Sequence, residues 1–242
     1  MDETAGGQRD VRPSHLVDAL ADLARQMQQK AGTEDTLEKV VTAAIALIPG
    51  AEEGSISVVT GRTEVESWAA SSDLPRGIDA LQSKVAEGPC LDAAFDAKVV
   101  DAPDMSTESR WPHFAQQASE MGVGAMMSFR LFISGNDLGA MNLYNRAPHA
   151  FDEESRQIGL PFVAHAAVAL AQALQRTSQQ TAMDSRDLIG QAKGILMERH
   201  KLSAAQAFNL LITVSQHRNV KLRDIAEELT SSGQLVGPRG SI

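Results

Sequence analysis

The chain has 242 residues, 43% of them hydrophobic and 22% charged, so it is long enough for one or two domains and apolar enough to bury a core, which excludes wholesale disorder. The charge is uneven: residues 1–176 hold 14 Lys and Arg against 25 Asp and Glu, a net of −11, whereas residues 177–242 hold 8 against 6, a net of +2. This asymmetry suggests a nucleic-acid or other acidic partner for the C-terminal segment, and ordinary fluctuation of composition is the alternative for so small a surplus. The acidic body would itself repel nucleic acid, which confines any such contact to the C-terminal segment.

Two helices are expected near the N-terminus. Residues 1–13 are polar, lack the basic and apolar regions of a signal peptide, and are expected to be disordered. Apolar residues spaced 4, 3 and 4 apart from Leu16 to Met27 then form one stripe on a first helix. A second helix is expected to begin at Thr33, whose hydroxyl can cap it, and to end at Pro49-Gly50.

A change to β-rich segments predicts strands in the next part of the chain. Ser55–Thr60 and Thr63–Ala69 are joined by a tight turn at Gly61-Arg62. The elements expected after them are a helix at Ile78–Val85, a strand at Val99-Val100, a helix at Trp111–Met121, and strands at Val123–Ile133 and Leu138–Asn145. Residues Ser134–Asp137 between the last two strands are a strong hairpin signal.

A long helix is expected from Asp152 to about Arg176, with Pro161 kinking or interrupting it. Its apolar stretch, Phe162–Leu174, is interrupted by two polar residues and falls short of the ~18–20 residues that a membrane helix needs. The elements up to this point predict an antiparallel α+β domain with its helices on one face of the sheet.

The order of these elements resembles that of a GAF domain, a ligand-sensing fold with a central antiparallel sheet. The resemblance covers about residues 30–176 and rests on three segments: Glu87-Gly88-Pro89-Cys90, Arg110-Trp111-Pro112-His113-Phe114, and Leu138-Gly139-Ala140-Met141-Asn142-Leu143-Tyr144. Candidate ligand-pocket residues are Trp68, Cys90, Trp111, Met126 and Phe129, although core packing explains these side chains as well. The cofactor stays unknown, because GAF domains of similar fold bind cyclic nucleotides, haem, bilins or nothing known.

Cys90 is the only cysteine, so an internal disulfide and a multi-cysteine metal site are excluded, which fits a reducing cytoplasm. One interpretation of Cys90 is a redox or bilin-attachment thiol. The alternative is a buried structural cysteine, and it is favoured because the acidic neighbours Glu87 and Asp92 should raise the pKa of the thiol.

The C-terminal segment predicts three short helices after a polar stretch at Thr177–Thr181. The first runs from about Asp184 to His200, and the third covers Leu222–Leu229. The second opens at Ser203, which is expected to form a capping box with Gln206. Three helices in about 50 residues make a very small bundle, which is marginal alone.

This segment is similar to an ANTAR domain. The matching residues are Ile189-Gly190-Gln191-Ala192-Lys193-Gly194-Ile195-Leu196-Met197-Glu198-Arg199, Ala205-Gln206-Ala207-Phe208, Ser215, Asn219 and Lys221-Leu222-Arg223-Asp224-Ile225-Ala226. The resemblance implies a protein that binds a pair of RNA hairpins in nascent transcripts, generally as a dimer, and so prevents a terminator hairpin from forming. The RNA-binding residues carried over from it are Gln191, Lys193, Arg199, Ser215, Asn219, Lys221 and Arg223, with Lys193 foremost.

The residues themselves are compatible with RNA binding. Arg186 and Lys193 share a helical face, and Gly190 and Gly194 expose backbone to a phosphate or a neighbouring helix. Phe208 is expected to lie near the core stripe of its helix, which would leave the segment without an aromatic stacking platform. A solvated cationic face is the alternative that composition alone leaves open.

No enzyme is expected, because the sequence contains no phosphate-binding loop, no nucleophile elbow, no zinc-protease motif and no metal-ligand cluster.

The predicted protein is a cytoplasmic, signal-responsive transcription antiterminator. Residues 1–13 are expected to be a disordered N-terminus, residues 14–176 a GAF sensor with dimerisation helices, and residues 177–242 an ANTAR domain. The expected homodimer would be held by the Leu16–Met27 stripe packed beside the 152–176 helix, and packing of that stripe within one chain is the alternative. The alternatives are a DNA-binding regulator with a helix-turn-helix, and a GAF interaction protein that binds no nucleic acid.

Overall fold

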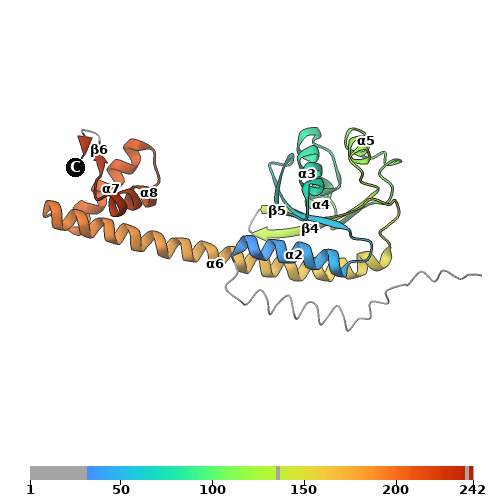
Figure 1. Ribbon diagram of the computed structural model, residues 1–242, viewed down its shortest axis with the longest axis horizontal. Coiled ribbons are helices and arrows are strands. Elements are labelled where there is room, and N and C mark those ends of the chain that lie inside the picture. The colour runs from blue at the N-terminus through green and yellow to red at the C-terminus, as the bar shows by residue number, and fades with distance from the viewer. Residues whose placement is uncertain (1–31, 135–136, 238–239, 242) are drawn as a thin grey trace, which may run out of the picture. The chain divides into compact units, whose positions relative to one another are not determined.

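The computed structural model describes residues 32–134, 137–237 and 240–241, and it divides into two compact units between Leu174 and Gln175 (Figure 1). The expectations for residues 1–31, including the Leu16–Met27 helix, therefore lie outside the described residues.

The first unit is built on a five-stranded antiparallel sheet. Its strands are β1 (Glu53–Thr60), β2 (Glu64–Ala70), β3 (Val99–Ala102), β4 (Ala125–Ser134) and β5 (Asp137–Asn145), in the order β2-β1-β5-β4-β3. Three residues connect β1 to β2, because Thr60 pairs with Glu64, and Gly61 and Arg62 in this turn have φ angles of 64° and 84°, in the left-handed region. Both predicted hairpins and the α+β class are confirmed.

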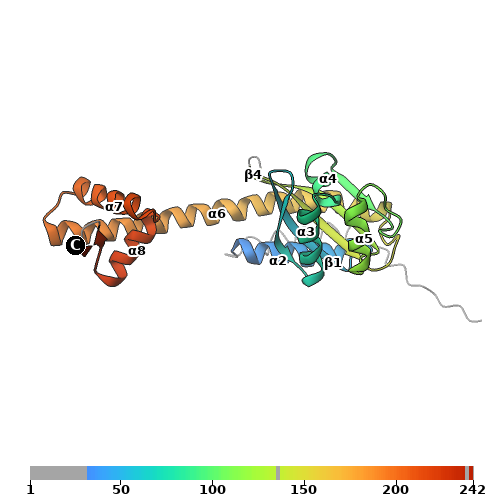
Figure 2. The same ribbon diagram turned by 90° about the horizontal axis from the view of Figure 1, so that it is seen from above.

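Helices cover both faces of this sheet, so the expectation of helices on one face is wrong. One face carries α2 (Thr33–Leu47) and the first part of α6 (Glu153–His200), which run side by side (Figures 1 and 2). The other carries α3 (Asp73–Val85), α4 (Pro89–Phe95) and α5 (Pro112–Glu120). Six consecutive residues of β1 are buried, as expected for a sheet covered on both sides.

Several helix ends differ from the expected ones. The N-cap of α2 is Gly32 rather than Thr33, which is the first helical residue. Helix α3 begins at Asp73, five residues before the expected start, and the hydroxyl of its N-cap Ser72 accepts the Leu74 N–H at 3.2 Å. The short helix α4 was not expected at all, because Gly88 and Pro89 at its start are also typical of turns.

Helix α6 is continuous over 48 residues, through both Pro161 and the polar stretch that was expected to separate two helices. Residues 175–184 are exposed on every side of the helix. Polar residues alone do not end a helix where neither glycine nor proline intervenes. A helical segment that is polar on all sides is typical of a connection between two packed regions.

By length and composition alone, α6 could cross a membrane: its most apolar 18-residue window has a mean hydropathy of 1.4. The expectation from sequence considered only the apolar stretch Phe162–Leu174. Core helices meet the same criterion, and Phe162, Ala166 and Leu170 of α6 are buried in the core of the first unit. This measure therefore gives only weak evidence and does not by itself indicate a membrane.

The second unit packs the end of α6 against α7 (Ala204–Arg218) and α8 (Leu222–Ser232), followed by the short strands β6 (Val236–Gly237) and β7 (Gly240–Ser241). The predicted capping box is confirmed: Ser203 Oγ accepts the Gln206 N–H at 3.3 Å, and Gln206 Oε1 accepts the Ser203 N–H at 2.9 Å. The core is wholly aliphatic and consists of Ala192, Leu196, Ala207, Leu211, Val214, Ile225, Ala226, Leu229 and Leu235.

Replacing Gly159 with alanine should destabilise the first unit by about 1–3 kcal/mol, the usual cost of overpacking a core. A Cβ there would lie 2.2 Å from Phe129 Cζ, where α6 crosses the sheet. Urea unfolding followed by tryptophan fluorescence measures this, since Trp68 and Trp111 both belong to the first unit. The matched control is Gly190→Ala on the same helix, where nothing lies within 4 Å of a Cβ. It should leave that transition unchanged and stabilise the second unit by ~1 kcal/mol.

Candidate functional sites

The second unit places two of the predicted RNA-binding residues, Ser215 and Asn219, on one face of α7. Together with Phe208 and Ile212 they are spaced 4, 3 and 4 apart, so all four share a stripe along the helix. Ser215 Oγ donates to the Val220 carbonyl at 2.6 Å. Asn219 ends α7 with a φ of 51°, a left-handed conformation that asparagine adopts more readily than most residues. Both residues thus shape the α7–α8 turn as well as lining the surface.

Lys193 meets this stripe from α6, because its Nζ lies 5.7 Å from the centroid of the Phe208 ring. That separation is within the range of a cation–π interaction. The expectation that Phe208 lies near the core is wrong: the residue is 37% exposed and belongs to none of the buried clusters. Its position one residue after buried Ala207 turns it about 100° away from the core.

The other four predicted residues are not gathered at this place. Lys221 and Arg223 are exposed at the start of α8, beyond the α7–α8 turn. Arg199 donates to the Gly233 carbonyl at the end of α8. Gln191 is two residues before Lys193 and so lies about 160° round α6 from it. The structure therefore joins Lys193 with the α7 stripe and the turn, and separates Gln191 and Arg199 from them.

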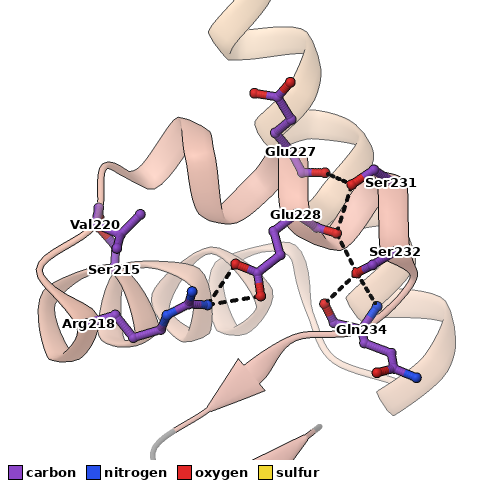
Figure 3. A network of polar contacts seen from close by, with 8 residues as sticks. All are labelled: Ser215, Arg218, Val220, Glu227, Glu228, Ser231, Ser232 and Gln234. Carbon is purple, nitrogen blue, oxygen red and sulfur yellow. Dashed lines mark hydrogen bonds and ion pairs between the residues drawn. The ribbon is translucent and has the colours of Figure 1, made fainter.

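An ion pair between Arg218 of α7 and Glu228 of α8 joins the two helices. Arg218 Nη1 donates to both carboxylate oxygens of Glu228, at 3.0 and 2.8 Å, as Figure 3 shows. In the same view Ser232 links the end of α8 to Gln234. Because its guanidinium is engaged by Glu228, Arg218 contributes to fixing the turn rather than offering a free cation.

Inside the first unit, a buried carboxyl group occupies the space between the sheet and α3. Asp79 accepts hydrogen bonds from Ser57 at 2.7 Å, Asn142 Nδ2 at 3.3 Å and the Tyr144 hydroxyl at 3.4 Å. Burial raises the pKa of Asp79 from 3.8 to about 6, and the hydrogen bonds oppose that rise only in part. Two further buried atoms of the cluster, Asn142 Oδ1 and Gln82 Nε2, have no hydrogen-bond partner in the described part of the chain.

Sequence reasoning missed Asp79, although a signal was present. The helix expected at residues 78–85 is buried at Ile78, Leu81 and Gln82, and an acid next to Ile78 and three residues before Gln82 falls on the same face. Among residues 32–134, 137–237 and 240–241, no group of three or more His, Cys, Asp or Glu is placed to hold a metal ion.

Two family models match the chain, and the larger is a GAF domain model over residues 30–171, more than half of the sequence. The chain belongs to the GAF domain family. An ANTAR domain model matches residues 177–229, within the second unit. GAF domains are signal-sensing and ANTAR domains are RNA-binding antitermination modules, so both are regulatory and non-catalytic.

Solved structures share the fold of the GAF domain. A phycoerythrobilin-bound GAF domain from a cyanobacterial phytochrome is 15% identical, with a TM-score of 0.51 over 67% of this chain and 97% of that one. The photosensory core module of a Stigmatella aurantiaca phytochrome is 13% identical, with a TM-score of 0.58 over 88% of this chain and 46% of that one. A free methionine-R-sulfoxide reductase from Neisseria meningitidis is 11% identical, with a TM-score of 0.52 over 73% and 99%. No curated protein of similar sequence was found.

The GAF domain does not bring the five predicted pocket residues together. Trp68 and Phe129 pack on the sheet face that carries α2 and α6, whereas Cys90, Trp111 and Met126 pack on the opposite face. Strand β4 explains the division, because Met126 and Phe129 are three residues apart and so point to opposite sides of the strand.

Cys90 is fully buried in the GAF domain. Burial raises the pKa of its thiol, and the charge of Asp79 adds to the rise. The acid responsible is therefore Asp79 rather than Glu87 or Asp92. Glu87 instead lies 2.8 Å from the His113 ring, and Asp92 accepts the Trp111 indole N–H at 3.0 Å. A neutral, enclosed thiol of this kind is unreactive.

Proposed function

We propose that this protein is a signal-responsive transcription antiterminator that acts in the cytoplasm. Its ANTAR domain, which we assign to residues 177–242, binds paired hairpins in nascent RNA and so prevents a terminator from forming. The observation that supports this most directly is the ANTAR match over residues 177–229, in a segment of net positive charge that follows an acidic one. Ser215, Asn219 and Lys221 lie along α7 and the turn after it, and Lys193 of α6 meets α7 at Phe208. These residues can contact phosphates and bases.

Substituting alanine for Lys193 should weaken binding to a synthetic two-hairpin RNA about tenfold and lower the salt slope of binding by about 1, since one phosphate contact is lost. A salt titration of wild type and variant measures both quantities. Lys201→Ala is the matched control: it removes the same charge from the same domain, but Lys201 is paired with Glu198 at 2.8 Å. Wild-type protein that ignores every hairpin at low salt, both as the full chain and as residues 177–242 alone, would contradict the proposed function.

The alternatives predict other outcomes of the same titration. A DNA-binding regulator would bind duplex DNA as tightly as hairpin RNA. A GAF interaction protein would bind neither nucleic acid at low salt. The ANTAR match favours RNA over both alternatives.

We further infer that the protein is a homodimer whose GAF sensor, assigned to residues 14–176, controls the ANTAR domain. Leu160 and Val168 of α6 are large apolar side chains exposed on the GAF domain, and α6 continues unbroken into the ANTAR domain. Light scattering tests the dimer against the chain mass of 25.9 kDa. If residues 177–242 bind hairpins as tightly as the full chain under every condition, the GAF domain does not control RNA binding.

A further inference from the structure

Phe208 is the only Phe, Trp or Tyr in residues 177–242, and the ANTAR domain leaves it 37% exposed. The core of the domain is built entirely from smaller aliphatic side chains. Aromatic side chains are among the strongest contributors to a core because they bury so much apolar surface. Because Phe208 is 37% exposed, part of its ring is available to a partner.

The surroundings of Phe208 are those of a nucleic-acid contact. The ring stands at the start of the α7 stripe, which continues through Ile212 to Ser215 and Asn219 over about 16 Å. Lys193 Nζ lies 5.7 Å from the ring centroid and so brings a cation to the same place. The stripe therefore combines an aromatic face, an ammonium group, a hydroxyl and an amide.

We propose that Phe208 is a stacking platform for an unpaired base of an RNA hairpin loop, with Lys193 binding a phosphate beside that base. This inference rests on the proposed RNA-binding function and names the part of the RNA that the surface takes. Loop bases are unstacked and can lie on an aromatic side chain, whereas bases within a stem cannot. Stacking on a phenyl ring tolerates any base, so sequence preference comes from the amide and hydroxyl groups farther along the stripe.

A second copy of this chain fits the surface less well. The centre of a protein–protein interface is depleted in lysine and serine, and the stripe includes Ser215 and is flanked by Lys193. The same cation beside an aromatic ring is favourable for a base with its attached phosphate.

The test compares Phe208→Ala, Phe208→Tyr and wild type in full-length protein, on one RNA hairpin with a natural loop and on the same stem with an abasic loop. The alanine variant should bind the natural loop about 10- to 100-fold more weakly with an unchanged salt slope. The tyrosine variant should bind as wild type does. On the abasic loop wild type and Phe208→Ala should be equal, because no base remains to stack.

Three outcomes would overturn the inference. If the wild-type protein binds no hairpin, both the proposed function and the proposed stacking site are wrong. If wild type and Phe208→Ala bind the natural loop equally tightly, Phe208 is not a stacking site, although the protein still binds RNA. A change of molecular mass in Phe208→Ala, measured by light scattering without RNA, would show that the ring contacts a second copy instead. Circular dichroism confirms that each variant is folded.

Discussion

Replacing Asp79 with asparagine is expected to remove a pH-dependent loss of stability from the GAF domain. Burial raises the pKa of this carboxyl from 3.8 to about 6. The folded domain therefore holds its proton more tightly than the unfolded chain does. The resulting stabilisation is fully present below the unfolded pKa and is lost as the pH rises through the folded pKa near 6. A difference of about two pKa units corresponds to about 3 kcal/mol.

Asparagine replaces the neutral carboxyl group with a neutral amide of the same shape. Its carbonyl oxygen can still accept from Ser57, which donates to Asp79 at 2.7 Å. Its amide group can donate to Asn142 Oδ1, a buried acceptor that has no partner in the described part of the chain. The variant should therefore equal wild type near pH 4 and exceed it by about 2–3 kcal/mol above pH 7.

Urea unfolding between pH 4 and 8, followed by tryptophan fluorescence, isolates this effect. Only the difference between variant and wild type matters, because acids such as Asp104 and Asp152 have lowered pKa values and change stability in the opposite direction with pH. Glu64→Gln neutralises an exposed carboxylate at the start of β2 and serves as the control. An Asp79→Asn variant that falls further below wild type in stability as the pH rises from 4 to 8 would show that the cluster requires the charged form.

Elements specified by neighbouring residues could be predicted from the sequence. The hairpin at residues 134–137 and the capping box at Ser203 depend on residues two to four positions apart, so their signals are local. The two-sided covering of the sheet could not be predicted in this way. Ser55 and Ser57 have the pattern of a solvated face, and they are buried because the distant Asp79 and Tyr144 hydrogen-bond to them.

The candidate RNA surface shows the same limit. Ser215, Asn219 and Lys221 lie within seven residues of one another, and their proximity follows from the end of one helix and the start of the next. The contact of Lys193 with Phe208 joins two helices, and periodicity within one helix does not report it. A shift of one position on α7 decides whether an apolar residue faces the core, as Ala207 does, or the solvent, as Phe208 does.

Truncating Leu211 to alanine should abolish hairpin binding by unfolding the ANTAR domain while the GAF domain stays intact. Leu211 is completely buried in a small core, which has nine buried residues in the described part of the domain. Removing a buried leucine costs about 2–5 kcal/mol, and a domain of this size has only about 3–5 kcal/mol to lose. Far-UV circular dichroism should lose helical signal, whereas the tryptophan transition should not move, because both tryptophans belong to the GAF domain.

Thr213→Ala is the matched control for Leu211→Ala, two residues along the same helix. Thr213 is exposed, and its hydroxyl donates only to the Asn209 carbonyl of its own helix, so its loss should change stability by less than about 0.5 kcal/mol. If Leu211→Ala shifted the tryptophan transition as well, the two units would unfold as one, and the ANTAR domain would draw its stability from the rest of the chain. If the variant kept full helical signal and full hairpin affinity, the nine-residue core would not be what holds the RNA surface in place.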